Sequence, residues 1–396
     1  MPAVLEMDLP VERILAEPSV ARQVVPPGFD YIRTARGLEA VSYAACEAVL
    51  RNTALERRLP EVFRASGVRD ETVLDISAGL LNNAQGDRHL RLRQALGAFF
   101  APQRVEAARA MIAERIATLL ARADRPAGLD LVRDVARHIP AHLFAHLIGV
   151  SPRQRAYFNR ISIEAFRVFE MNPELGDGVT GAWRDAAAWV NGLIESQRGE
   201  TGDTLLPYLA EQRRAGLLDE DEMRLAVTML LIGSVDTTQG LMGVMMRAFV
   251  DCPDQWQALR EDPSRVPAAV LEAARWRPAE PWIFRVAPDG VELEGIPARP
   301  GEHIYALIAA ANRDPAVFEN PDTFDINRVG EHLPLTWGLG RHFCLGRSFA
   351  VMELEELLLG CLLRWPALGY RDPVSGAAAS YFSARFTLPV KPVTPV

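Results

Sequence analysis

Residues 336–350, TWGLGRHFCLGRSFA, place Cys344 among glycines and basic side chains just before an apolar helical pattern. A helix N-terminus carries partial positive charge and free N–H groups, and Arg341, His342 and Arg347 lie beside the cysteine. Both features favour a thiolate and predict a lowered pKa for the Cys344 thiol. The residues alone leave three interpretations open: an inert buried cysteine, a nucleophile with His342 as its base, or a thiolate under a cofactor.

The glycines of this stretch bear on the third interpretation. Gly338, Gly340 and Gly346 carry no side chain, so the backbone can approach another group closely. A flat cofactor lying over the loop would need that clearance.

Helical patterns dominate the elements that must position this loop. Apolar residues recur at helical spacing over 104–123 and after Cys344, and the segment 219–250 begins with acids and is apolar on nearly every side. Strand signals cluster in 283–310, between Gly and Pro turns. No composition break divides the chain. We expect a mainly α fold with small β-sheets, formed by one large helix-rich domain over 1–396 with a minor β-rich subregion.

Composition excludes several classes of protein. The chain has 396 residues, 49% of them hydrophobic, and its net charge of −8 argues against nucleic-acid binding. Asp236, Gln239 and Arg247 interrupt the most apolar region, so we expect no membrane span. Scattered cysteines without a CxxC pair predict neither a disulfide framework nor a zinc site, and they favour a reducing cytoplasm. These cysteines are Cys46, Cys252, Cys344 and Cys361.

The loop WGLGRHFCLG resembles the haem-binding loop of the cytochrome P450 family, Phe-Gly-x-Gly-x-His/Arg-x-Cys-x-Gly, with Trp337 in place of the phenylalanine. The resemblance implies the cytochrome P450 fold, haem b as cofactor, and Cys344 as the axial ligand of the iron. It places Gly338, Gly340 and Gly346 against the haem. A thiolate ligand pushes electron density toward bound oxygen and favours O–O cleavage.

A Glu-x-x-Arg pattern supports the resemblance. Glu272 and Arg275 are three residues apart, which by itself describes any exposed helical ion pair. In the family this pair joins a later arginine in a buried network, and Arg328 is the candidate here. The resemblance therefore implies a structural trio beneath the haem loop.

Cationic and imidazole side chains from separate segments match the family's haem-propionate partners. His89 and Arg93 lie one helical turn apart, and Arg285 and His342 come from later segments. A solvated basic face is the alternative for the first two. Four such donors suit two carboxylates.

Three histidines at four-residue intervals, His138, His142 and His146, suggest a metal site at first. Pro140 interrupts their face, and no carboxylate follows at a metalloprotease spacing. We expect no metal ion there.

The motif GSVDTT, residues 233–238, places polar side chains inside the apolar segment. Thr237 can donate a hydrogen bond to the carbonyl of Gly233 and bend the helix, which would open a pocket for dioxygen. The motif is similar to the family's Ala/Gly-Gly-x-Asp/Glu-Thr-Thr, with Ser234 at a position where glycine is usual. The resemblance implies that Thr237 steadies the reduced oxygen and Asp236 relays protons to it.

These features predict a haem-thiolate monooxygenase that inserts one oxygen atom from O2 into an apolar or aromatic small molecule, by C–H hydroxylation or oxidative dealkylation. A peroxide-driven or isomerising haem-thiolate enzyme and a non-enzymatic haem sensor or carrier are the alternatives. Asp236 and Thr237 favour the monooxygenase, because neither alternative needs a proton relay for dioxygen. The substrate pocket is expected to include residues near 80–83 and 166–169, together with Leu230, Gly233, Trp282, Ile283 and Phe382.

Electrons are expected from separate proteins, because the chain ends too soon after Cys344 for a fused flavin or iron–sulfur domain. The resemblance implies a ferredoxin and a ferredoxin reductase that uses NAD(P)H. Arg91, Arg341 and Arg347 are candidates for docking the acidic partner. We expect a monomer in the cytoplasm.

Overall fold

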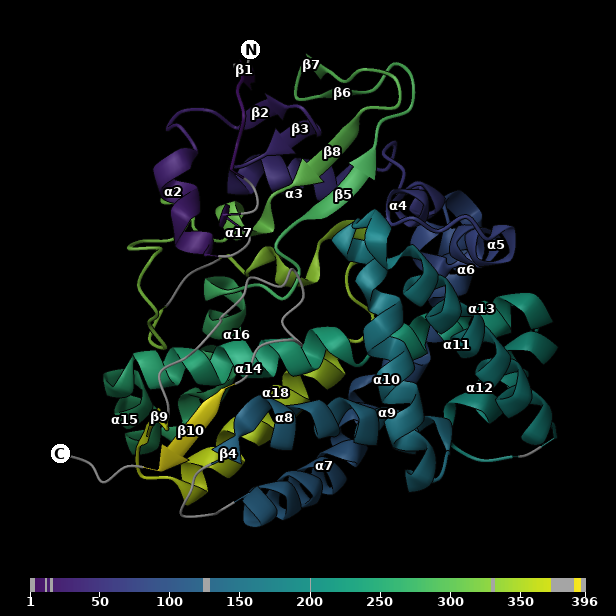
Figure 1. Cartoon of the computed structure of the whole chain (residues 1–396), viewed down its shortest axis with the longest axis vertical. Coiled ribbons are helices and arrows are strands. Elements are labelled where there is room, and N and C mark those ends of the chain that lie inside the picture. The colour runs from purple at the N-terminus through teal and green to yellow at the C-terminus, as the bar shows by residue number, and fades with distance from the viewer. Residues whose placement is uncertain are drawn as a thin grey trace.

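A computed structural model describes residues 4–10, 13–14, 17–123, 129–199, 201–328, 332–371 and 388–392. Helices make up most of this structure, and the long ones lie below the largest sheet in the view of Figure 1. The helices are α2 (Ala21–Val24), α3 (Tyr43–Arg51), α4 (Leu59–Ala65), α5 (Glu71–Gly79), α6 (Gly86–Gly97), α7 (Pro102–Ala123), α8 (Leu131–Asp134), α9 (Ile139–Ile148), α10 (Arg155–Phe166), α11 (Gly176–Ser196), α12 (Leu205–Arg214), α13 (Glu220–Gly233), α14 (Asp236–Asp251), α15 (Pro253–Glu261), α16 (Val266–Trp276), α17 (Ile308–Ala311) and α18 (Arg347–Arg364).

The strands form three small sheets. The largest has the order β1-β2-β3-β8-β5, in which β8 runs parallel to β3 and antiparallel to β5. A three-stranded sheet has the order β4-β10-β9, and β6 pairs with β7. The predicted mainly α fold with small sheets is therefore confirmed. The strands are β1 (Val4–Glu6), β2 (Tyr31–Thr34), β3 (Gly37–Ala40), β4 (Leu129–Asp130), β5 (Ile283–Val286), β6 (Glu292–Leu293), β7 (Ile296–Pro297), β8 (His303–Ala306), β9 (Leu368–Tyr370) and β10 (Pro389–Pro392).

The apolar segment predicted as one helix forms two, α13 and α14, with Ser234 and Val235 between them. A capping box begins α13, because the Asp219 carboxylate accepts a hydrogen bond from the N–H of Glu222 and the Glu222 side chain accepts one from the N–H of Asp219. By length and composition the stretch Glu220–Asp251 could cross a membrane, but 67% of its most apolar window is buried. This burial is typical of a central core helix, and Figure 1 shows α14 running between α16 and α18.

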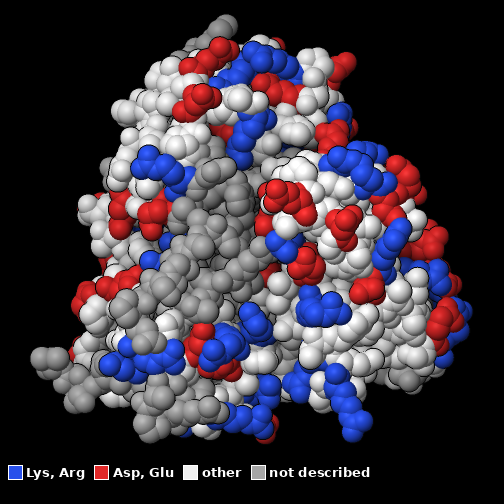
Figure 2. Space-filling model, in the orientation of Figure 1, with Lys and Arg blue, Asp and Glu red and all other residues white. Residues whose placement is uncertain are grey.

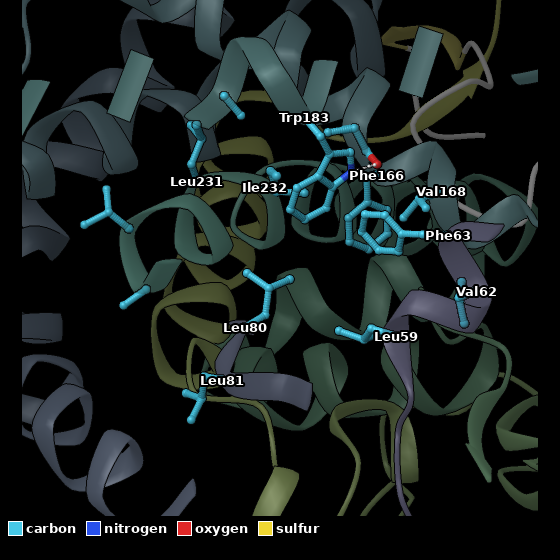
Figure 3. Close-up of a cluster of buried hydrophobic side chains, with 14 of the residues drawn as sticks. Leu59, Val62, Phe63, Leu80, Leu81, Phe166, Val168, Trp183, Leu231 and Ile232 are labelled. Atoms are coloured by element: carbon cyan, nitrogen blue, oxygen red, sulfur yellow. Dashed lines mark hydrogen bonds between the residues drawn. The ribbon is translucent and has the colours of Figure 1, made fainter. Parts of the chain in front are cut away.

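An apolar cluster joins α4, α10 and α11 (Figure 3). The rings of Phe63 and Trp183 meet edge to face with centroids 4.9 Å apart, and Phe166 lies beside them. The indole N–H of Trp183 donates to the carbonyl of Ala165 at 3.0 Å, so its polar end is satisfied. Such an aromatic pair contributes about 0.5–1.5 kcal/mol beyond the burial of its area. The cluster holds the three helices in a fixed relation.

The predicted trio Glu272, Arg275 and Arg328 forms, as the Glu-x-x-Arg pattern indicated. Arg275 donates two hydrogen bonds to the Glu272 carboxylate, at 2.7 and 2.8 Å, and Arg328 donates a third at 3.0 Å. The side chains of Glu272 and Arg275 are only 3% and 2% exposed. The pair is thus a buried ion pair rather than the exposed helical pair that the spacing alone allows.

The same network reaches the segment that precedes residues 337–346, which form the loop around Cys344 and are called the cysteine loop. Arg275 Nη1 donates to the carbonyl of Asn312 at 2.9 Å, and the Asn312 side chain accepts from the N–H of Leu335 at 2.8 Å. The hydroxyl of Thr336 donates to the carbonyl of Ala274 at 2.6 Å, on the same helix as Arg275. These bonds attach residues 335–336 to α16 and so fix where the loop begins.

We expect Glu272→Gln to destabilise the fold by about 3–5 kcal/mol, because the substitution leaves the Arg275 charge buried without its partner. Glu195→Gln is the matched control, since Glu195 and Arg198 have the same i,i+3 spacing but are 55% and 54% exposed. Urea unfolding should show a large drop in midpoint for the first variant and none for the second. Equal midpoints would contradict the structural role of the trio.

Candidate functional site

A large cavity lies between the cysteine loop, the break between α13 and α14, and helices α6 and α10. It encloses about 1860 Å³ of space free of protein atoms, including its mouth. Its wall contains most of the residues singled out in the sequence, brought together from four segments of the chain. These residues are His89, Arg93, Leu230, Gly233, Thr237, Ile283, Arg285, Gly338, His342, Cys344 and Gly346.

Other residues proposed from the sequence lie elsewhere. Gly340, Trp282 and Asp236 are not among the described residues that line the cavity. The Trp282 ring packs against Tyr305, with centroids 5.4 Å apart, because it projects from the other side of the segment leading into β5. Phe382 lies outside the described residues.

The backbone of the cysteine loop explains two of its glycines. Gly338 and Gly340 adopt φ of +69° and +67°, a left-handed conformation that favours glycine. At Gly340 a Cβ would also lie 3.1 Å from the carbonyl oxygen of Leu50 at the end of α3. Gly340 therefore serves the packing of the loop on α3. The loop is closed by a hydrogen bond from the N–H of Cys344 to the carbonyl of Trp337 at 2.9 Å.

The prediction of a lowered thiol pKa is wrong for Cys344. Cys344 is exposed to the cavity, yet the protein packed around it and the charge of Glu280 raise the pKa of its thiol to about 11. The N–H groups of Gly346 and Arg347 and the charge of Arg93 act in the predicted direction, but they lower the pKa by less than the surrounding protein raises it. A metal ion at the sulfur would reverse the balance, since a coordinating thiol is deprotonated outright.

Two histidines contact each other on the cavity wall. The rings of His89, from α6, and His342, from the cysteine loop, have centroids 4.5 Å apart. Burial, with a smaller effect from neighbouring arginines, lowers the pKa of His89 to about 4 and that of His342 to about 2. Both ring nitrogens of His89 and Nε2 of His342 are buried with no hydrogen-bond partner among the described residues. Buried polar groups of this kind normally meet a partner.

Sequence reasoning missed two charged residues beside this cluster. Arg57 and Glu280 line the cavity, and Arg57 Nε is buried without a hydrogen-bond partner in the described structure. Burial and the charge of Arg57 lower the pKa of Arg285 well below its usual range, while Glu280 raises it. No pattern around Arg57 or Glu280 marks them, because only the fold brings residue 57 beside residue 285.

The motif GSVDTT, residues 233–238, lines another part of the cavity wall. The Thr237 hydroxyl donates to the carbonyl of Gly233 at 3.2 Å, across the break between α13 and α14. Ser234 lines the cavity, and its hydroxyl is 3.4 Å from the carbonyl of Leu231 in its own helix. The helix is interrupted at this motif, where a local weakening was expected from that hydrogen bond.

Two carboxyl groups stand near this wall. Asp236 is buried at the start of α14 and accepts a hydrogen bond from the Gln239 amide at 3.0 Å. Glu353, on α18, lines the cavity, and burial raises its pKa well above the usual range. Glu353 was not identified from the sequence, although an acid within the apolar pattern after Cys344 is a usable signal.

Comparison with known proteins agrees with this geometry. The family model for cytochrome P450 matches residues 165–366. The 6-deoxyerythronolide B hydroxylase of Saccharopolyspora erythraea is 32% identical over 75% of this chain and 73% of that protein. The steroid C26-monooxygenase of Mycobacterium tuberculosis is 30% identical over 78% of this chain and 84% of that protein. A crystal structure of P450BioI with an acyl carrier protein superposes with a TM-score of 0.87 at 25% identity, covering 96% of this chain and 99% of that chain.

This chain belongs to the cytochrome P450 family. It is an oxidoreductase that uses haem to insert oxygen into small organic molecules, and its electrons come from NAD(P)H through redox partners. The side chains present fit that cofactor. A thiol lies on the cavity wall, and unpartnered imidazole and guanidinium nitrogens gather in one part of the same wall, as two carboxylates would require.

If Cys344 binds the iron, Cys344→Ala should abolish the Soret band that marks thiolate ligation in the reduced, carbon-monoxide-bound protein. Cys361→Ala is the control, because Cys361 lies fully buried in the apolar core on α18 and away from the cavity. Absorption spectra of both variants check this expectation. A Cys344→Ala protein that keeps the thiolate band would rule out Cys344 as the ligand.

Proposed function

We propose that this protein is a haem-thiolate monooxygenase in which Cys344 is the iron ligand and Thr237 serves the oxygen side. One observation carries the proposal: Cys344, from the loop before α18, and Thr237, from the first turn of α14, line the same cavity. Haem, when bound, supplies the oxygen activation, because a thiolate ligand pushes electron density toward oxygen and favours O–O cleavage. The chain's own residues hold the cofactor, manage protons and select the substrate.

We assign the cluster of nitrogen donors to the haem carboxylates. Arg93, Arg285, His89 and His342 would hold the two propionates, and Arg57 joins them because its side chain lines the same cavity. Hydrogen bonds between ionised partners are about twice as strong as neutral ones. The propionates would also relieve the repulsion among these arginines.

Thr237 and two carboxyl groups handle protons in this proposal. The Thr237 hydroxyl donates a hydrogen bond to the carbonyl of Gly233 and can rotate to donate its proton into the cavity instead. Asp236 stands behind it at the start of α14 and would resupply that proton, with water as the link. Glu353 is a further proton donor, since its raised pKa keeps it protonated on the cavity wall.

Thr237→Ala is expected to lower the product formed per NADPH several-fold and to raise hydrogen peroxide correspondingly, because the proton donor at the cavity wall is lost. Thr118→Ala is the matched control, since the Thr118 hydroxyl makes the same i−4 bond, to Glu114, on the exposed face of α7. NADPH, product and peroxide are measured together, with reductase and ferredoxin supplied. Unchanged coupling in Thr237→Ala would contradict the assignment.

We further propose an apolar or aromatic small molecule as substrate, oxidised by C–H hydroxylation or oxidative dealkylation. The cavity wall away from the arginines is largely apolar and includes Leu80, Leu81, Phe166, Phe169 and Leu230. Relatives named for 6-deoxyerythronolide B and for a steroid support this substrate class.

A ferredoxin with its reductase is the proposed electron source, and we propose a monomer in the cytoplasm. Of the three candidate docking arginines, Arg91 is paired with Glu222 at 2.7 Å, and Arg341 donates to the carbonyl of Thr53 at 2.6 Å. Arg347 lies over the Trp337 ring, with its guanidinium carbon 5.0 Å from the centroid. Arg347 is therefore the docking residue we favour, because it lies beside the cysteine loop and, unlike Arg91, forms no salt bridge with a described carboxylate.

A panel of steroids, macrolactones, fatty acids and polar aromatics should separate by their Soret shifts, with the uncharged apolar compounds giving saturable shifts. For the tightest compound, we expect Leu230→Gln to weaken binding about tenfold, which corresponds to about 1.4 kcal/mol of lost apolar contact. Leu363→Gln is the control, because Leu363 is 89% exposed on α18. A panel in which only charged compounds bind would overturn the proposed class.

A further inference from the structure

A second hollow lies between α7, α9, α10 and the turn 136–138, on the outside of the helical part. It contains about 1180 Å³ free of protein atoms, including its open mouth. It shares no described lining residue with the large cavity that contains Cys344 and Thr237, which is called the haem cavity from here on. The polar side chains on its wall include Arg115, Arg137, His138, Arg155, Asn159 and Arg160.

The hollow is strongly positive. Its four arginines come from α7, the turn 136–138 and α10, and none of them forms a salt bridge with a described residue. The described carboxylate on its wall, Glu164, is bound by Arg167 at 3.0 Å. In Figure 2, blue side chains lie over the lower centre of the molecule, where Figure 1 places these helices, with little red among them.

The arginines are close enough to disturb one another. Burial lowers the pKa of Arg115, and the charges of Arg155 and Arg122 lower it further. Burial, Arg155 and Arg115 together lower the pKa of His142 to about 4, so this histidine is neutral. Cations held together in this way, without a matching anion, cost free energy that a bound anion would recover.

Several polar atoms of the hollow also lack partners. Nε of Arg115 and Nε of Arg137 are buried without a hydrogen bond to any described residue, and so is Oδ1 of Asn159. Leaving a buried donor unsatisfied costs about 1–3 kcal/mol. The side chains that carry these atoms line the hollow, where a bound anion would meet the two guanidinium groups.

Of the three histidines at four-residue intervals, His138 lines this hollow and His142 contacts one of its arginines. Among the described residues, no group of three histidine, cysteine or acidic side chains is placed to hold a metal ion. The Arg155 guanidinium contacts Nδ1 of His142 directly, which blocks that nitrogen and repels a cation.

We propose that this hollow binds a small phosphate-bearing ligand with at least two negative charges. Arginine presents paired N–H donors that match phosphate oxygens, and three separate elements supply them here. The concave shape and the buried donors favour a small molecule over a flat protein surface. Because the hollow is separate from the haem cavity, the ligand would not compete with substrate.

Pyrophosphate is the probe, titrated into the haem-loaded protein by calorimetry at about 0.15 M salt, where surface charges are largely screened. We expect one saturable site and no change in the Soret band. Arg115→Gln and Arg137→Gln should each weaken binding at least about tenfold, or 1.4 kcal/mol. Arg153→Gln is the control, because Arg153 is exposed beside the hollow without lining it, and it should change binding less than about twofold.

The outcomes are decisive in both directions. Absence of saturable binding, or equal weakening in Arg153→Gln, overturns the proposal. Citrate binding as tightly as pyrophosphate overturns the phosphate preference, and binding of an acidic protein alone would make the region a docking surface instead. If either the Arg115→Gln or the Arg137→Gln protein fails to fold, Arg160→Gln is measured in its place. Arg160 is exposed, so its substitution leaves no buried group unpaired.

Discussion

The buried ion pair between Glu272 and Arg275 connects segments that are far apart in the chain. Arg275 uses its remaining N–H groups on the carbonyls of Asn312, Pro321 and Thr323, while Glu272 accepts from Arg328 and from the N–H of Asp325. Two charges removed from water are tolerable only when every one of their bonds is made, so this geometry has little freedom. Hydrogen bonds of Asn312 and Thr336 connect this rigid network to the start of the cysteine loop and fix its position.

The cavity above the loop combines requirements that oppose each other. A dry wall suits an apolar substrate and strengthens every charge interaction inside it. The protein packed around Cys344 raises the pKa of its thiol although the residue is exposed to the cavity, and burial leaves His89 and His342 neutral with unpartnered nitrogens. An iron ion at the sulfur and carboxylates at the nitrogens resolve both problems together, which is why the site fits haem better than a free cysteine nucleophile.

The two hollows differ in what surrounds their cations. In the haem cavity, arginines and histidines share a wall with leucines and phenylalanines, as a cofactor with a charged edge and an apolar face requires. In the hollow beside α10, four arginines share the wall with small or aliphatic side chains such as Ala141 and Ile163, and no leucine or phenylalanine is among its described lining residues. One helix, α10, serves both, since Phe166 lines the first and Arg155 and Asn159 line the second.

Features that depend on near neighbours in the chain were predictable. The helix pattern after Cys344, the i,i+3 pair of Glu272 and Arg275, and the i−4 bond of Thr237 are local, because helix geometry alone brings those groups together. Tertiary structure decided whatever depends on burial and on distant segments. It placed Arg57 and Glu353 on the cavity wall, turned Trp282 toward Tyr305, and raised the thiol pKa that local charge was expected to lower. Desolvation is set by all the segments that pack around a group, and a stretch of sequence does not contain them.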